Sequence, residues 1–372
     1  MAWAERIELY KKIEKHRGRP LIAYVTSKRE GVYAFMSTDA LPCIIEQIDQ
    51  LPKDSNAVDF LIVSLGGDPM VAWRMMSFVR QRVEKVGVLI PQSAYSAATL
   101  VAFGADEIIM HPNGHLGPVD MQITTWGDSE RPRSFSTEDI SAFLDFVRDH
   151  LKITDQEHIR TLFEITCKEV STLGIGFTSR SSKLAVDLGE RLLAMHMQDD
   201  ESRSKLRTIV ENMSRKFQSH AYPVSRKEAI DTGLPVKKER DAEMEGLMWS
   251  VWLDIEQDLK ERTPFNPIFE LLRSPEAKTL LSQVPQMDLP MCATGSAHFQ
   301  TTIDDVKKHS KLVTNPIDFE FTNAIVESKD LARSHVTRGK ILSCRNPDLL
   351  IHYNLVTASR EWEKVKNPEK GQ

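Results

Sequence analysis

The segment Val58–Ser64 is almost continuously apolar, and it constrains the possible fold more than any other part of the chain. Short apolar runs of this kind are typical of strands that are buried on both faces of a sheet. Gly66 and Gly67 end the strand, and the pattern then predicts a helix to about Glu84. The next expected elements alternate in the same way, which favours an α/β fold with right-handed crossovers. They are a strand at 86–89, a helix at about 96–104 and a strand at 107–110.

Two turns of this region follow strands at their carboxyl ends, where ligands bind in α/β sheets. One turn contains Gly66 and Gly67, and the other is rich in small residues and contains Ser96. Ser96 begins an alanine-rich helix, so its hydroxyl either caps that helix or acts as a nucleophile at the positive end of the helix dipole. A glycine N–H and the N–H that follows the serine could together hold an oxyanion.

The rest of the chain predicts further helices and a change of composition near a charged run at 237–243. We expect a helix before the first strand, a polar loop at 124–133 and mainly helices from there to residue 232. A chain of 372 residues is long for one compact domain. The predicted division is an N-terminal helix (1–17), a main domain (18–240) and a smaller α+β appendage (241–372).

Composition excludes several classes of protein. The net charge of -5 argues against a general nucleic-acid binder. The four cysteines lie far apart, which indicates reduced thiols, a cytoplasmic location and no cysteine-based zinc site. Pro112 and Gly114 separate His111 from His115, so we expect no shared metal site there. We expect no signal peptide, because the N-terminus is charged and helix-periodic, and no membrane span, because no uncharged apolar run is long enough. No nucleotide-binding glycine motif is present, and we expect no cofactor.

Four blocks of sequence, in order along the chain, resemble the serine dehydrogenase proteinase group. That group is related to signal peptide peptidase A and, more distantly, to the Clp protease subunit. The resemblance covers roughly residues 18–236. It implies a ClpP/crotonase-like fold built from superhelical turns, a protein or peptide substrate and assembly into a homo-oligomer. The blocks are Val63–Pro69, Ala94–Met110, Leu116–Gln122 and His220–Leu234.

The same resemblance assigns roles to individual residues. It makes Ser96 the nucleophile and the N–H groups of Gly67 and Ala97 the oxyanion hole. Gly66 and Asp68, on either side of Gly67, are then expected to contact the substrate. Two other serines compete with Ser96 for the nucleophile's role, but neither aligns with the serine of the family; they are Ser93 and Ser64.

The proton acceptor departs from the pattern of the family. Signal peptide peptidases use a lysine some forty to fifty residues after the serine, whereas this chain has no lysine between Lys85 and Lys152. Arginines in that stretch stay protonated and cannot act as bases. One alternative is a later lysine, although each candidate lies in a predicted helix and is more often a solvated charge; these are Lys152, Lys168 and Lys183. The other alternative is His220, oriented by Asp120 in a triad of unusual order.

The sequence therefore predicts a serine peptidase that forms an acyl-enzyme through Ser96. One alternative is an inactive scaffold of the same fold that binds peptides or partner proteins, which the missing lysine favours. Another is an acyl-CoA enzyme of the crotonase type, which uses similar oxyanion geometry without a nucleophile.

Overall fold

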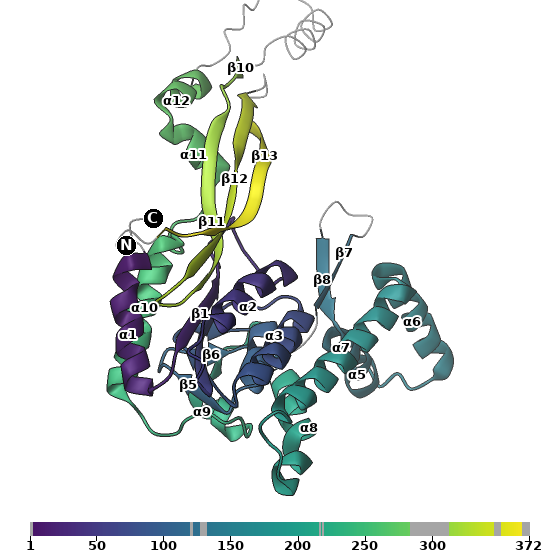
Figure 1. Ribbon diagram of the computed structural model, residues 1–372. Coiled ribbons are helices and arrows are strands. Elements are labelled where there is room, and N and C mark those ends of the chain that lie inside the picture. Colours follow the sequence, from purple (N-terminus) through teal and green to yellow (C-terminus); the bar gives the residue numbers. More distant parts are fainter. Residues whose placement is uncertain are drawn as a thin grey trace, which may run out of the picture.

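The structure is a computed structural model that describes residues 3–119, 122–126, 132–215, 217, 219–282, 312–345 and 351–366. Its centre is a sheet with helices on both faces, and two arms extend from this body (Figure 1). One arm consists of long C-terminal strands, and the other is mainly helical.

Four parallel strands form one side of the sheet, in the order β1-β2-β3-β5, with β5 last in the order. Their residues are almost all buried, as the apolar run at Val58–Ser64 predicts for a covered parallel sheet. The strands are β1 (Leu21–Thr26), β2 (Ala57–Val63), β3 (Lys85–Ile90) and β5 (Glu107–Met110).

Alternate residues of these strands face two separate cores, as the two-residue period of a strand requires. Phe60 and Ile62 face the larger core, and Leu61 and Val63 face the smaller one. The larger core includes residues of α2 (Leu41–Asp49), α3 (Pro69–Arg82) and α4 (Ala97–Phe103), and also residues of three later helices that are described below. The 3-10 helix η1 (Thr38–Ala40) precedes α2. The helices on the smaller core are α1 (Trp3–Arg17) and α10 (Ala242–Asp258).

The C-terminal strands continue the central sheet. β11 pairs antiparallel with β1, then with β12, and β12 pairs with β13, so the predicted α+β segment adds strands to the sheet of the main domain. The division predicted near residue 240 stays a prediction about independent folding. The strands of this arm are β10 (Leu312–Val313), β11 (Ile317–Glu327), β12 (Ala332–Arg345) and β13 (Ile351–Lys364), with the helices α11 (Pro267–Arg273) and α12 (Pro275–Ser282) beside them.

The other arm corrects the sequence prediction in two places. The polar loop expected at 124–133 contains paired strands, because Ile123 lies opposite Phe135 and Thr125 opposite Arg133 in a hairpin. The sequence also predicts a helix from about Arg180 to Met197, but this helix begins at Thr172. The Ser171 side chain accepts a hydrogen bond from Gly174 N and caps it there. The elements are β7 (Gln122–Trp126), β8 (Pro132–Ser136), α5 (Thr137–Asp145), the π-helix η2 (Phe146–His150), α6 (Gln156–Val170), α7 (Thr172–Leu193) and α8 (Asp200–Arg215).

A second, small sheet lies next to the carboxyl end of β2. Its strands are ordered β4-β6-β9, and Ser64 forms a bridge with Ala94 of β4. These strands are β4 (Ser93–Ala94), β6 (His115–Leu116) and β9 (Val224–Ser225), and α9 (Arg226–Asp231) follows the last of them.

The fold class predicted from the sequence is confirmed as a mixed α/β architecture consistent with a ClpP-like fold. Within the described ranges, every helix is too short or too polar to cross a membrane.

Candidate active site

Ser96 occupies a sharp turn between β4 and α4. Its backbone has φ 51° and ψ -115°, a conformation that costs a residue with a side chain roughly 1–3 kcal/mol. Ser96 holds the N-cap position of α4, yet its side chain makes no capping hydrogen bond. The structure therefore gives the helix-capping interpretation of this serine no support. A strained serine at a strand-to-helix turn is the arrangement that exposes the nucleophile in α/β-hydrolases.

Gly66 packs directly against this turn. A β-carbon built on Gly66 would lie 2.5 Å from Tyr95 O and 2.8 Å from the Ser96 Cβ. Gly66 also has φ 92°, which L side chains rarely adopt. The close approach of the two turns thus requires a glycine, in agreement with the sequence argument that both turns share one site.

The hydrogen bonds of Met36 determine where the Gly67 amide points. Met36 N donates to Gly66 O at 2.6 Å, and Met36 O accepts from Asp68 N at 3.0 Å. In a parallel bridge of this kind the N–H of the intervening residue, Gly67, points away from the bridged strand. The preceding residue, Gly66, contacts the Ser96 turn, and Tyr95 N donates to Ser64 O at 3.0 Å. The Gly67 N–H thus points away from Met36 and belongs to a segment that packs against the Ser96 turn.

Ala97 supplies a second amide at the same place. It is the first residue of α4, so its N–H has no acceptor within the helix. Across the residues that the structure describes, neither this amide nor that of Gly67 donates a hydrogen bond. Two amides at a helix start can stabilise a negative oxygen.

The two competing serines are engaged elsewhere. Ser64 Oγ is hydrogen-bonded to Thr26 Oγ1 at 2.7 Å and accepts from Gly66 N at 3.0 Å. Ser93 Oγ accepts from Lys28 Nζ at 3.2 Å. Both serines are buried, at 1% and 2% exposed, whereas Ser96 is partly exposed. Only Ser96 of the three is accessible to a substrate.

Lys28 lies against α10, which covers the smaller core. Its ammonium is over the Trp252 ring of α10, 4.6 Å from the ring centroid, and donates to Gln92 as well as Ser93. Burial lowers the pKa of Lys28 to about 8, against opposing attraction from Glu261. Nothing in the sequence pattern singles out this lysine, which precedes the serine in the chain.

The predicted proton acceptors have different surroundings. His220 is half-buried and precedes β9, and the antiparallel pairing of β9 with β6 places it at the same end of the small sheet as Ser96. Asp120 lies outside the described residues. Lys152, Lys168 and Lys183 are all exposed. Among described residues none is hydrogen-bonded to the Ser96 hydroxyl, so the identity of the base stays a prediction.

Asp68 has a structural task in α3. Its side chain accepts a hydrogen bond from Met70 N at 2.9 Å and caps the helix. The carboxylate is nevertheless exposed, so its predicted contact with substrate stays a prediction.

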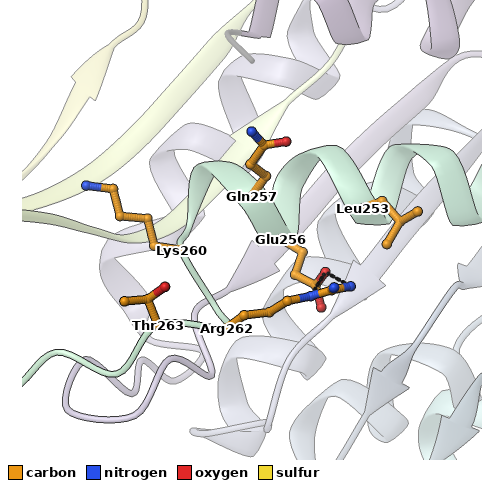
Figure 2. Close-up of a pocket in the computed structure, with 6 residues that line it drawn as sticks. All are labelled: Leu253, Glu256, Gln257, Lys260, Arg262 and Thr263. Carbon is orange, nitrogen blue, oxygen red and sulfur yellow. Dashed lines mark hydrogen bonds and ion pairs between the residues drawn. The ribbon is translucent and has the colours of Figure 1, made fainter.

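Two of the cavities outside this turn are relevant here. One of about 420 Å³ is at the carboxyl end of α10, where Glu256 and Arg262 pair at 2.7 Å and Lys260 extends away from the pair (Figure 2). It contains none of the predicted site residues. The other, of about 300 Å³, lies beside Met36, between the 34–40 segment and the C-terminal strands. No group of three or more acidic, histidine or cysteine side chains suited to a metal ion occurs in the described parts of the chain.

The chain is similar to proteins of one family and to two archaeal relatives. Residues 2–134 match the family model described as ClpP-like SDH-type serine proteinase. The uncharacterized protein MJ1495 of Methanocaldococcus jannaschii is 30% identical over 125 residues, which are 32% of this chain and 42% of the relative. The uncharacterized protein MJ0137 of the same organism is 28% identical over 124 residues, or 32% and 43% of the two chains. Each match thus spans less than half of the relative's length.

Similarity to a solved structure is weak in the following case. The structure is a mutant of the 1510-N membrane-bound stomatin-specific protease, at 13% identity and a TM-score of 0.35, covering 61% of this chain and 83% of that chain. A similarity of this size supports no argument about function. The family match is the stronger finding, and over residues 2–134 it confirms that this chain resembles the ClpP-like SDH-type serine proteinases.

Proposed function

We propose that this protein is a serine peptidase whose nucleophile is Ser96, acting on polypeptides in the cytoplasm. The observation that carries the proposal is the conformation of Ser96, which is strained, partly exposed and not used for capping. Strain of this kind persists in a fold only where the surroundings enforce it, and it concentrates at functional sites. The family match over residues 2–134 supports protease chemistry in general.

In the proposed reaction, Ser96 Oγ attacks the carbonyl carbon of a peptide bond as a base removes its proton. The N–H groups of Gly67 and Ala97 stabilise the negative oxygen of the tetrahedral intermediate. The C–N bond then breaks, the amine leaves with the proton from the base, and an acyl-enzyme ester remains. Water hydrolyses that ester by the reverse proton transfers and frees Ser96. The proposed chemistry uses no cofactor.

We keep His220 as the proposed base, with Asp120 to orient it, and a later lysine as the alternative. The topology supports His220, because the chain that enters β9 and the chain that leaves β4 lie at one end of the small sheet. A lysine would need burial to lose its proton near neutral pH, and each of the three candidates is exposed in the single chain.

A fluorophosphonate probe tests the nucleophile, because only an activated serine is labelled. We expect wild-type protein to be labelled and to cleave an unfolded, fluorescently tagged protein substrate. The Ser96→Ala variant should lose both properties while keeping its circular dichroism spectrum. The matched control is Ser93→Ala, three residues away, which should keep both. Loss in Ser93→Ala alone would move the nucleophile to Ser93, and an unlabelled wild type would favour the inactive scaffold.

We further propose that the protein forms a homo-oligomer through its helical arm. The arm exposes large apolar side chains, among them Leu173 at 87%, Ile165 at 52% and Phe177 at 48%. Clustered exposed apolar residues of this kind commonly mark interfaces. Light scattering at micromolar concentration should show an oligomer for wild type and a smaller species for Leu173→Glu. The control Leu342→Glu, on the strand arm, should keep the wild-type mass, and a monomeric wild type would reject the proposal.

A further inference from the structure

The cavity beside Met36 is built from parts of the chain that are far apart in sequence. Its volume is about 300 Å³. The segment before α2 forms one wall, and the faces of β11, β12 and β13 form the other. The residues that matter for its chemistry are Tyr24, Phe35, Asp39, His335, Arg360 and Trp362.

This cavity adjoins the candidate active site through one strand pairing. Met36 is hydrogen-bonded to the Gly66–Asp68 segment, and the next residues along the chain, Phe35 and Ser37, line the cavity. The Ser96 turn lies on the other side of the Gly66–Asp68 segment. The cavity and Ser96 are therefore separated by two strand spacings, which is about 10 Å. An extended peptide spans this distance in about three residues.

Aromatic side chains form the walls. The rings of His335 and Trp362 are stacked, with centroids 5.1 Å apart, and Phe35 is 58% exposed at the rim. Exposure of a large aromatic residue beside a concave site is typical of ligand binding. Tyr24, at the base, is buried.

The cavity contains one carboxylate, and that carboxylate is already satisfied. Trp362 Nε1 donates to Asp39 at 2.9 Å. Although partial burial opposes the effect, hydrogen bonds from Ser37 and Trp362 lower the pKa of Asp39. Burial lowers the pKa of His335, so this ring is neutral near pH 7.

Arg360 is the cation left without a partner. Its guanidinium makes no hydrogen bond or ion pair with any residue that the structure describes. Two other arginines of these strands are paired: Arg333 with Glu46 at 2.8 Å, and Arg338 with Glu320 at 2.6 Å. Lys364 lies two residues beyond Trp362 on the same face of β13, so positive charge prevails on this face.

We propose that this cavity is a specificity subsite that binds an acidic side chain of the polypeptide substrate, with Arg360 as the partner of its carboxylate. The aromatic walls contact the methylene groups of that side chain, and the planar guanidinium accommodates a carboxylate in two parallel hydrogen bonds. The bound residue lies about three positions from the bond that Ser96 attacks. This inference rests on the proposed peptidase function, and it names the class of substrate.

Binding to the Ser96→Ala variant tests the subsite apart from catalysis. The probes are fluorescent peptides whose amino and carboxyl ends are blocked by acetylation and amidation. They share one sequence, except that a single Asp occupies a different position in each peptide. A second series carries Asn in place of that Asp. We expect one Asp position to bind roughly tenfold more tightly than its Asn counterpart, as measured by fluorescence anisotropy. Comparing each amide with the same peptide carrying a free carboxyl end shows whether a C-terminal carboxylate binds in the cavity. Tighter binding through the C-terminal carboxylate than through the Asp side chain would overturn the side-chain assignment.

Substitutions at Arg360 complete the test. Arg360→Gln should reduce binding of the favoured Asp peptide to that of its Asn counterpart, and Arg360→Glu should favour a Lys peptide. The control Arg160→Gln, on the distant helix α6, should change nothing. Equal binding of Asp and Asn peptides, or a preference that survives Arg360→Gln, overturns the subsite. If the wild type cleaves peptides without this preference, only the subsite fails; if Arg360-dependent binding occurs without any cleavage, only the peptidase function fails.

Discussion

Gly66 lies so close to Ser96 that a β-carbon on the glycine would be 2.8 Å from the β-carbon of the serine. Real β-carbons do not approach one another to that distance, so the two turns touch only because position 66 has no side chain. The contact connects the end of β2 with the start of α4. It therefore fixes the position of the proposed nucleophile relative to Gly67.

Gly66→Ala should consequently abolish activity while leaving most of the fold intact. The new methyl group would meet Tyr95 O and Ala97 N as well as Ser96, and the backbone at φ 92° would be strained. We expect peptidase activity and fluorophosphonate labelling to fall by about a hundredfold or more, as for the loss of an oxyanion donor. Stability should fall by roughly 1–3 kcal/mol in urea unfolding.

The matched control is Gly246→Ala in α10. A β-carbon there meets nothing within 4 Å, so alanine should raise helix stability slightly and leave labelling unchanged. Normal labelling of the Gly66→Ala variant would show that the contact with Ser96 is irrelevant to the chemistry.

The sequence was sufficient to predict the parallel sheet and the position of Ser96. Both depend on local signals. Val58–Ser64 is an apolar run typical of a buried strand, and Gly66 and Gly67 after it mark a turn. The resemblance over the same region added the role of the serine, and residues 2–134 match the expected family.

The subsite and the strand pairing beside it could not be predicted in this way. Met36 and Arg360 lie more than 300 positions apart, and only the folded sheet brings their segments to one cavity. Nothing in the sequence near Met36 predicts a strand, because its pairing with Gly67 is a single bridge. Contacts between distant segments leave no periodic pattern in the sequence.

Lys28 should make stability depend on pH above neutrality. Burial lowers its pKa from 10.5 to about 8 in the folded protein. Between these values the unfolded chain binds more protons, so the contribution of Lys28 to the free energy of unfolding rises from pH 8 to 10.5. Below pH 8 the buried charge should cost up to about 3 kcal/mol.

Lys28→Met removes this cost, so its stability relative to wild type should be greatest below pH 8 and should decline towards pH 10.5. Urea unfolding of both proteins at pH 7.5, 9 and 10 measures the difference. Lys85→Met is the control, because the Lys85 side chain is 67% exposed. The difference in unfolding free energy between this variant and wild type should stay constant. A constant difference for Lys28→Met as well would reject the predicted effect of burial.

Arg6 should be among the most sensitive residues of the fold. It joins three elements, because its guanidinium donates to Glu327 of β11 at 2.7 Å and to Asp254 of α10 at 2.6 Å. The side chains of these carboxylates are only 1% and 8% exposed. Arg6→Met would leave both buried without their cation, which typically costs roughly 3–5 kcal/mol.

Urea unfolding should show this loss for Arg6→Met, and no measurable loss for Arg148→Met, whose ion pairs with Asp145 and Asp149 are exposed. The double variant Arg6→Met with Glu327→Gln should recover part of the stability, because one of the unpaired charges is gone. Equal stability of wild type and Arg6→Met would mean that the buried network contributes nothing net.

Deleting residues 241–372 tests whether the C-terminal segment folds separately, as the sequence predicts. A chain that ends at Arg240 lacks α10, which covers one face of the central sheet. It also lacks β11, which covers the edge of β1. The buried side chains lost from α10 alone amount to roughly 10 kcal/mol of burial, comparable with the whole stability of a domain. They are Met244, Met248, Val251, Trp252 and Ile255.

We therefore expect the shortened chain to aggregate or to unfold without a cooperative transition. A chain that ends at residue 345 is the control, because it lacks β13, whose residues are mostly exposed, and should still unfold cooperatively. Circular dichroism during heating distinguishes the outcomes. A cooperative transition of the chain that ends at Arg240 would show that residues 241–372 are a separate appendage, and that the sheet retains its fold without α10 and β11.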